Sequence, residues 1–272
     1  MPASRLIEMT FLVMVATAMA VPFVIALLLS FMEPQQFMAR GANFWPTRVD
    51  GYARALEAAP FVRYFINTVI VAGAITLGSL LTSILAAYVF ARFEFPGRDA
   101  LFLVVVATLM IPGHVTLIPN YLTLADLGLI DTYAALIVPF LASGFVTFFL
   151  RQHFRGIPRE LDDAARIDGA TRWQILWKII VPMSRPAIAA MALFQFIAEW
   201  NSYLWPLIVT NSDSVRTLQI GLAKVYATDA YDGLVDWPMV MAGAVLIMLP
   251  TILVFVIAER NLTKGIAMTV SK

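Results

Sequence analysis

The fold is decided by residues 64–91, which read YFINTVIVAGAITLGSLLTSILAAYVFA between Arg63 and Arg92. These 28 residues include no Asp, Glu, Lys or Arg. A helix that crosses a bilayer needs about 20 consecutive, mostly apolar residues, and this stretch exceeds that length. We therefore expect residues 64–91 to form a transmembrane helix.

Five further runs are nearly free of charge, and they predict spans at about 9–32, 100–125, 132–150, 186–209 and 237–258. His114 lies inside the third predicted span, where Pro112 and Pro119 flank it and can break the helix. Glu199 is the one charged residue of the fifth. The pattern predicts an all-α membrane protein with six transmembrane helices in a single domain, residues 1–272.

The amino-acid composition excludes several classes of protein and of binding site. Charged residues make up 14% of the chain, against about 25% in soluble domains. The absence of Cys excludes disulfides and thiolate metal sites. A net charge of +1 is too small to give an electrostatic field that attracts nucleic acid. We expect no catalytic site, no metal site and no nucleic-acid partner; membrane lipid is the expected surrounding.

Orientation follows from the loops, because cytoplasmic loops carry an excess of Lys and Arg. With both termini in the cytoplasm, 13 of the 19 Lys and Arg residues lie inside. The outer segments 33–63 and 210–236 are then long enough to fold, and residues 51–59 look helical. Either segment could dock an external protein or be a solvated connector.

The inner segment 151–186 is different, since it carries eleven of the chain's 37 charged residues. Pro158 can begin a helix, and Gly169 can end it in the left-handed conformation. Thr171 can cap a second helix that runs to Pro182. We expect two short helices joined by a glycine turn at the cytoplasmic surface, with Ala164 and Ala165 small enough for a partner's backbone to approach.

The run Asp163-Ala164-Ala165-Arg166-Ile167-Asp168-Gly169-Ala170, followed by Ile179-Ile180-Val181-Pro182, resembles the EAA loop of bacterial ABC importer permeases. The family pattern is Glu-Ala-Ala, three residues, Gly, nine residues, Ile, any residue, Leu, Pro. Here Asp163 replaces Glu and Val181 replaces Leu, and the spacing of Gly169, Ile179 and Pro182 matches. The resemblance implies a type I permease fold whose coupling residues are Glu160, Asp163, Ala164, Ala165, Arg166, Asp168, Gly169 and Ala170.

Further stretches resemble the carbohydrate-uptake branch related to the maltose and glycerol-3-phosphate systems. They are Asn67-Thr68, the loop 92–98 and Glu199-Trp-Asn-Ser-Tyr-Leu-Trp-Pro206. The resemblance implies a multi-pass protein of the bacterial inner membrane that pairs with a second, homologous permease. Two cytoplasmic ATPases and an extracytoplasmic solute-binding protein would complete the system. No nucleotide-binding Gly-x-x-x-x-Gly-Lys-Ser/Thr is present, so ATP and Mg²⁺ are expected on the ATPases and no cofactor on this chain.

Polar residues inside spans are the candidates for solute contact. They form two groups, one of Glu199, Asn201, Tyr203 and Trp205 and one of His114 and Asn120. Carboxylate, amide and aromatic groups suit a sugar or sugar-like solute, from a di- or oligosaccharide to a glycerophosphodiester. Alternatively, Glu199 pairs at the permease–permease interface, the aromatic residues form an interfacial belt, and His114 satisfies a helix break.

Three other functions compete with this interpretation. A permease of a non-sugar ABC importer would share the EAA-like loop but not the motif at 199–206. An ion-coupled secondary transporter should show inverted repeats and several mid-span carboxylates, and only Glu199 fits. A haem-binding subunit would need paired histidines, whereas His114 and His153 occupy unrelated positions.

Overall fold

The computed structural model describes residues 3–34, 48–228 and 235–270, whose regular secondary structure is entirely helical, with no β-strand among them. Parts of both predicted outer segments, 35–47 and 229–234, lie outside the described residues. The chain forms two compact units, residues 1–64 with 218–250 and residues 65–217 with 251–272. The fold class predicted from the sequence, all-α, is confirmed.

The first unit holds α1 (Ala3–Leu29), α3 (Asp50–Ala58), α14 (Leu218–Thr228) and the first part of α15 (Trp237–Val270). Helix α3 confirms the helical stretch expected at 51–59. An ion pair joins Arg54 of α3 to Asp236, whose carboxylate also accepts the backbone N–H of Met239 at 3.0 Å and so caps α15. Side chains along α1 are exposed and apolar, as lipid contact requires.

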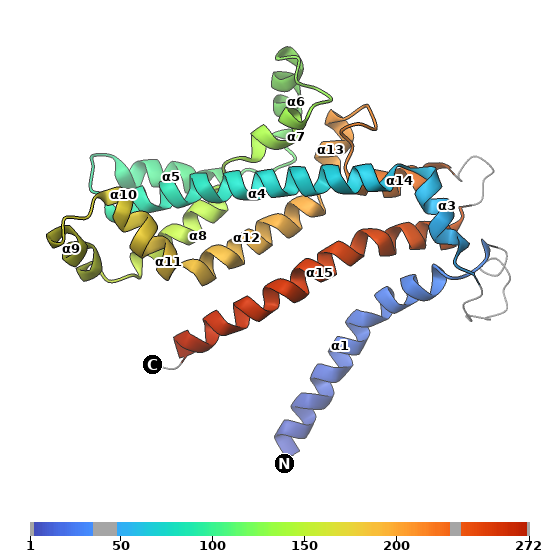
Figure 1. The fold of residues 1–272 in the computed structure, drawn as a ribbon, viewed down its shortest axis with the longest axis horizontal. Helices are drawn as coiled ribbons and strands as arrows, with labels where there is room; N and C mark the ends of the chain where they lie inside the picture. Colours follow the sequence, from blue (N-terminus) through green and yellow to red (C-terminus); the bar gives the residue numbers. More distant parts are fainter. Residues whose placement is uncertain (1–2, 35–47, 229–234, 271–272) are drawn as a thin grey trace. The chain divides into compact units, whose positions relative to one another are not determined.

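The second unit contains the remaining helices, which Figure 1 labels in chain order. They are α4 (Phe61–Arg92, from residue 65), α5 (Arg98–Thr108), α6 (Leu117–Asp126), α7 (Tyr133–Ile137), η1 (Val138–Phe140), α8 (Gly144–Arg155), α9 (Glu160–Ile167), α10 (Arg172–Ile175), the π-helical turn η2 (Leu176–Ile180), α11 (Val181–Met183), α12 (Arg185–Trp200) and α13 (Leu204–Val209). Residues 251–270 of α15 also belong to this unit.

Four described helical stretches are long and apolar enough to cross a membrane: Ile7–Leu29, Phe61–Arg92, Tyr133–Arg155 and Trp237–Val256. A fifth is the pair Arg172–Met183 and Arg185–Trp200, which bends by 78°. The predicted third span is divided into α5 and α6, with the break at His114 where the flanking prolines place it. Because neither piece spans a bilayer alone, the count of six stays a prediction.

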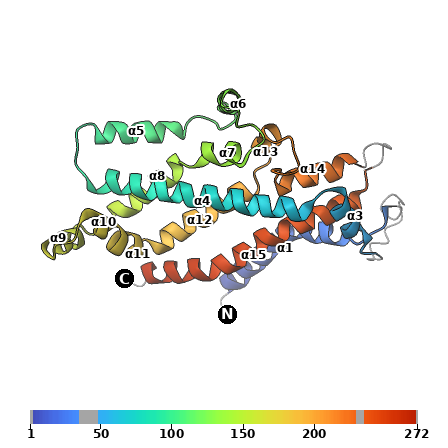
Figure 2. The same cartoon turned by 45° about the horizontal axis from the view of Figure 1, so that its top comes forward.

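Helix α4 takes part in both hydrophobic cores of the second unit. Toward its end, Ile84, Ala87 and Tyr88 pack with α8 and with the segment that holds α9 and α10. Nearer its start, Val71 and Ile75 pack with α6, α7 and α13. Figures 1 and 2 show α9 and α10 beside one end of α4 and α13 toward the other. One continuous helix therefore supports both groups of short helices.

Glycine allows close approach between α5 and α8. A Cβ on Gly144, the first residue of α8, would lie 2.8 Å from Thr108 Oγ1 and 3.1 Å from the carbonyl oxygen of Val105. Small residues at helix contacts let backbones pack closely in membranes. Gly144 therefore serves packing between these two helices.

We predict that Gly144→Ala lowers the thermal stability of the detergent-solubilised protein, because overpacking costs about 1–3 kcal/mol. Gly73→Ala is the matched control, since a Cβ there meets nothing within 4 Å. It should be neutral or stabilising, because Ala favours helix over Gly by about 0.5–1 kcal/mol. Equal thermal stabilities for the two variants would contradict the packing role.

Candidate functional site

The charged loop folds as two short helices around a glycine. Helix α9 begins after Pro158, and its first turn carries Glu160, Asp162 and Asp163 near the positive end of the helix dipole. Gly169 follows with φ of 81°, a left-handed conformation that glycine adopts without a steric penalty. The predicted helix and its glycine stop are confirmed.

Thr171 begins the second helix through a capping box with Gln174. The Thr171 hydroxyl accepts the backbone N–H of Gln174 at 3.3 Å, and the Gln174 side chain accepts the backbone N–H of Thr171 at 2.8 Å. Two N–H groups at the start of α10 are thereby satisfied.

This second helix was predicted to end at Pro182, and the helical stretch that begins at Arg172 ends one residue later, at Met183. The chain continues through η2 and α11, and the bend comes at Ser184. Pro182 lies within α11, at the start of its turn. Proline is tolerated in a first helical turn, where its missing N–H has no partner to lose, and the wide turn of η2 directly before it separates α11 from the regular helix α10.

Helix α9 has an outward and an inward face. Of the eight residues predicted to couple to an ATPase, six are exposed: Glu160, Asp163, Ala164, Arg166, Asp168 and Gly169. Ala170 is half-buried and Ala165 is buried in this chain's own core. Ile167 is 86% exposed beside them. Of the Ala164–Ala165 pair, only Ala164 is available for contact with a partner, while Ala165 fixes α9 to the second unit.

A buried ion pair that sequence reasoning missed also fixes α9. Arg92 Nε lies 3.3 Å from Asp162 Oδ2, and the two side chains are 3% and 6% exposed. Burial raises the pKa of the Asp162 carboxyl, and the charge of Arg92 opposes that rise. Removing one member of such a pair costs about 3–5 kcal/mol. The sequence carries no signal for it, because acidic residues occupy both faces of α9, with Asp162 buried and Asp163 exposed.

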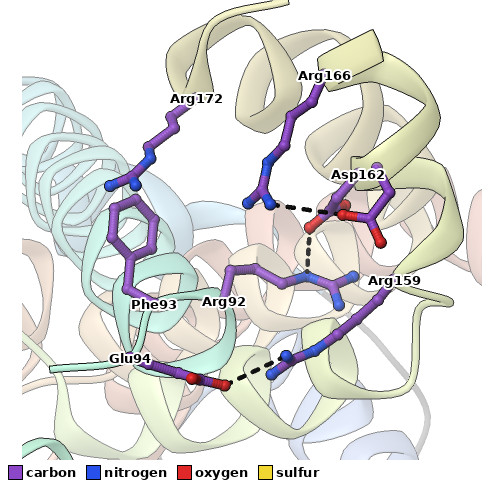
Figure 3. A pocket seen from close by; sticks show the side chains of 8 residues that line it. Arg92, Phe93, Glu94, Arg159, Asp162, Arg166 and Arg172 are labelled. Atoms are coloured by element: carbon purple, nitrogen blue, oxygen red, sulfur yellow. Dashed lines mark hydrogen bonds and ion pairs between the residues drawn. The ribbon is translucent and has the colours of Figure 1, made fainter.

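Figure 3 shows the cavity of about 380 Å³ around this pair, between α9 and the end of α4. Arg159 with Glu94 and Arg166 with Asp163 form ion pairs of 3.5 Å on its exposed rim. Such exposed pairs contribute about 0–1 kcal/mol. The guanidinium of Arg172 lies over the ring of Phe93 at 4.5 Å. The buried pair is thus the interaction that anchors α9.

A second cavity brings the two predicted solute-contacting groups together. Its volume is about 340 Å³, and His114, Asn120, Glu199, Tyr203 and Trp205 all line it. Thr116, Phe140 and Ser202 are among the other lining residues. Ser202 and Phe140 were not expected from the sequence, although Ser202 lies within the quoted motif and Phe140 follows the helix-breaking Pro139.

The remaining candidate, Asn201, does not line this cavity. Its side chain donates to the carbonyl oxygen of Ile197 at 2.8 Å, within its own helix. Asn201 therefore helps to end α12 at the break before α13.

Glu199 is half-buried and accepts a hydrogen bond of 3.0 Å from the Gln195 amide. Trp205 is 7% exposed and donates its indole N–H to the carbonyl oxygen of Ala135 at 3.0 Å. Trp200 is 2% exposed and packs on Phe65 and Phe196. An interfacial aromatic belt therefore fits Tyr203, which is 41% exposed, but not the two tryptophans.

Metal chemistry has no candidate cluster in the described part of the chain, where no three His, Asp or Glu side chains converge in a way that could hold an ion.

Comparison with known proteins identifies relatives among membrane transport proteins. Residues 78–267 match the family described as binding-protein-dependent transport system inner membrane component. The sn-glycerol-3-phosphate transport system permease protein UgpE of Agrobacterium fabrum (strain C58) is 40% identical over 228 residues, covering 84% of this chain and 80% of that protein. The protein of the same name from Brucella abortus (strain 2308) is 36% identical over 277 residues, covering 98% of each chain.

The fold has a solved counterpart in a crystal structure of a bacterial ABC transporter involved in the import of the acidic polysaccharide alginate. The TM-score is 0.81 at 24% sequence identity, and the alignment covers 96% of this chain and 98% of that one. This likeness confirms the permease fold of ABC importers. On the family match and the full-length relatives together, the chain belongs to the family of inner membrane components of binding-protein-dependent transport systems.

Proposed function

We propose that this chain forms half of the translocation pathway for a sugar or sugar-like solute, with a second, homologous permease forming the other half. ATP hydrolysis on two cytoplasmic ATPases, which hold ATP and Mg²⁺, drives transport, and an extracytoplasmic binding protein delivers the solute. The observation that carries this proposal is the exposed face of α9, which is free for a partner to contact. Helix α9 is at the same time anchored to the second unit through Asp162.

The coupling mechanism follows from this anchoring. The six exposed residues of α9 and its glycine turn are free to contact an ATPase, whereas Asp162 and Ala165 hold α9 to the second unit. When the ATPases close, α9 moves as a rigid body, and the spans packed on it move with it. Both chain termini lie on the ATPase side in this arrangement, and the six predicted spans cross the membrane between them.

The chemistry of the solute follows from the cavity of about 340 Å³. Its lining offers hydroxyl, amide, imidazole and carboxylate groups beside aromatic rings, and it includes no Lys or Arg. Such a lining suits hydroxyl groups of a polyol or sugar, because carboxylates and amides accept and donate hydrogen bonds while rings pack on C–H faces. The relatives named for sn-glycerol-3-phosphate support a small polyol moiety.

The alternative within transport is a non-sugar ABC importer. Thermal-shift screening of the cognate binding protein against sugars, glycerol phosphates, amino acids and peptides distinguishes the two. Stabilisation by a polyhydroxylated compound supports the proposal, and stabilisation only by amino acids or peptides overturns the proposed solute class.

We predict that Gly169→Val detaches or uncouples the ATPase while the permease remains inserted. Valine at a φ of 81° is strained by about 1–3 kcal/mol, and relief of the strain reorients α9 against α10. The measurements are co-purification of the ATPase and solute uptake in vesicles. Gly128→Val is the matched control, because Gly128 has φ of 66° with no atom near its Cβ position. It also lies outside the charged segment 151–186, which we call the coupling loop. Normal co-purification and uptake in the Gly169 variant would refute the coupling role.

We predict that Glu199→Gln impairs uptake more than assembly, because it removes the carboxylate from the cavity while keeping the side chain's shape. Gln195→Leu is the control, since it removes only the hydrogen bond that Glu199 accepts. Uptake rate and recovery of the assembled complex are measured together. A loss of assembly as large as the loss of uptake would assign Glu199 to the permease–permease interface instead.

A further inference from the structure

One end of α4 is bonded to the segment 210–217 through Asn67, which is 2% exposed. The Asn67 amide donates to the carbonyl oxygens of Ser214 at 3.0 Å and Arg216 at 2.8 Å. Its own oxygen accepts a hydrogen bond of 2.6 Å from the Tyr133 hydroxyl. Both amide protons and the carbonyl are therefore used, which fixes the segment against α4.

The segment is itself ordered by Asp131, whose carboxylate accepts the backbone N–H groups of Asn211 at 2.8 Å and Ser212 at 2.9 Å. The N–H of Ser212 is the largest influence that lowers the pKa of the Asp131 carboxyl. The neighbouring ion pair of Arg216 with Asp213 spans 3.1 Å. These contacts hold the segment in one conformation beside Asn67.

The other end of α4 is bonded to the coupling loop at three places. Besides its ion pair with Asp162 of α9, Arg92 donates from Nη2 to the carbonyl oxygen of Ile157 at 3.0 Å. One turn earlier, the Tyr88 hydroxyl donates to the carbonyl oxygen of Arg172 in α10 at 3.0 Å. Helix α4 therefore holds the residues before α9, α9 itself and the start of α10.

Between Asn67 and Arg92, α4 is one uninterrupted helix without proline. The 25 steps from Asn67 to Arg92 span about 38 Å at ~1.5 Å per residue, enough to join opposite faces of a membrane. The helices that precede and follow the coupling loop in the chain do not continue unbroken over the same distance. Helix α8 begins only at Gly144, and the other route bends by 78° at Ser184 and breaks again after Trp200.

From these contacts we infer that α4 is the element that transmits movement between the coupling loop and the segment 210–217 on the opposite membrane face, with Arg92 and Asn67 as the positioning residues at its two ends. The inference rests on the proposed function, because it assigns a route to the coupling between ATPase and solute delivery. It adds two residues that belong neither to the exposed face of α9 nor to the lining of the solute cavity.

The first test places a change at the end of α4 remote from the ATPase. In the reconstituted complex, Asn67→Leu keeps the side chain's size but removes the three hydrogen bonds to the segment and to Tyr133. Basal ATPase activity and ATPase co-purification should stay at wild-type values. Stimulation of ATPase activity by the loaded binding protein should fall by about five- to 150-fold, the range of typical coupling between sites.

Two companion variants keep this test decisive. Tyr133→Phe removes only the bond to the Asn67 carbonyl and should give a smaller loss of stimulation, even if Asn67→Leu fails to fold. Val69→Ala changes a side chain that is 43% exposed on the same helix and should keep full stimulation. Wild-type stimulation in both Asn67→Leu and Tyr133→Phe would overturn the inference.

The second test changes the end near the ATPase. Arg92→Met and Asp162→Leu each leave one buried charge without its partner, and both should reduce the amount of assembled complex. The double variant buries no charge and should recover assembly. Stimulation should remain below wild type, since the introduced methionine and leucine side chains would pack without fixing the register of α9 on α4. Arg159→Gln, in the exposed pair with Glu94, is the control and should behave as wild type.

The outcomes separate the inference from the proposed function. If the wild-type complex shows no stimulation by any loaded binding protein, the proposed function itself fails. If the wild type is stimulated and the double variant, once assembled, is stimulated equally, only the role of α4 fails. Loss of stimulation at both ends of α4, with basal activity kept, supports the inference.

Discussion

The coupling loop depends on one buried ion pair, that of Arg92 with Asp162. Two charges removed from water are stable only when each neutralises the other at close range, so the end of α4 and the inward face of α9 must stay together. Once they do, Ala165 packs into the core and the opposite face of α9 is turned outward. The charged surface that we propose as the ATPase contact is therefore positioned by an ion pair buried on the opposite side of α9.

The sequence predicted some parts of the molecule better than others. Charge-free runs identified the long helices at 64–91 and 237–258, because the cost of a charge in lipid applies to each residue regardless of tertiary structure. Gly169 and Thr171 were predictable for a similar reason, since backbone conformation and capping are local properties. The direction in which the Asp162 side chain points was not predictable. Both faces of α9 carry acidic residues, and only the position of Arg92 shows which face is buried.

The convergence of His114 and Glu199 on one cavity was also beyond the sequence. The two residues lie 85 positions apart, and nothing local relates them. In the sequence, His114 lies between two helix-breaking prolines and Glu199 is an isolated carboxylate in another span. Membership of the importer family excludes an ion-coupled secondary transporter and a haem-binding subunit.

The two helix breaks beside that cavity, at 109–116 and 201–203, bear on hydration. Backbone N–H and C=O groups outside a helix cannot face hydrocarbon without a partner, and at membrane depth they occur where protein or a water-filled space covers them. Both breaks adjoin the same hollow, and several of their backbone N–H groups donate to carbonyl oxygens of the same chain, as those of Val115 and Ser202 do. In the proposed pathway, a solute at this hollow exchanges part of its hydration shell for the polar side chains and the backbone carbonyl groups of the two breaks.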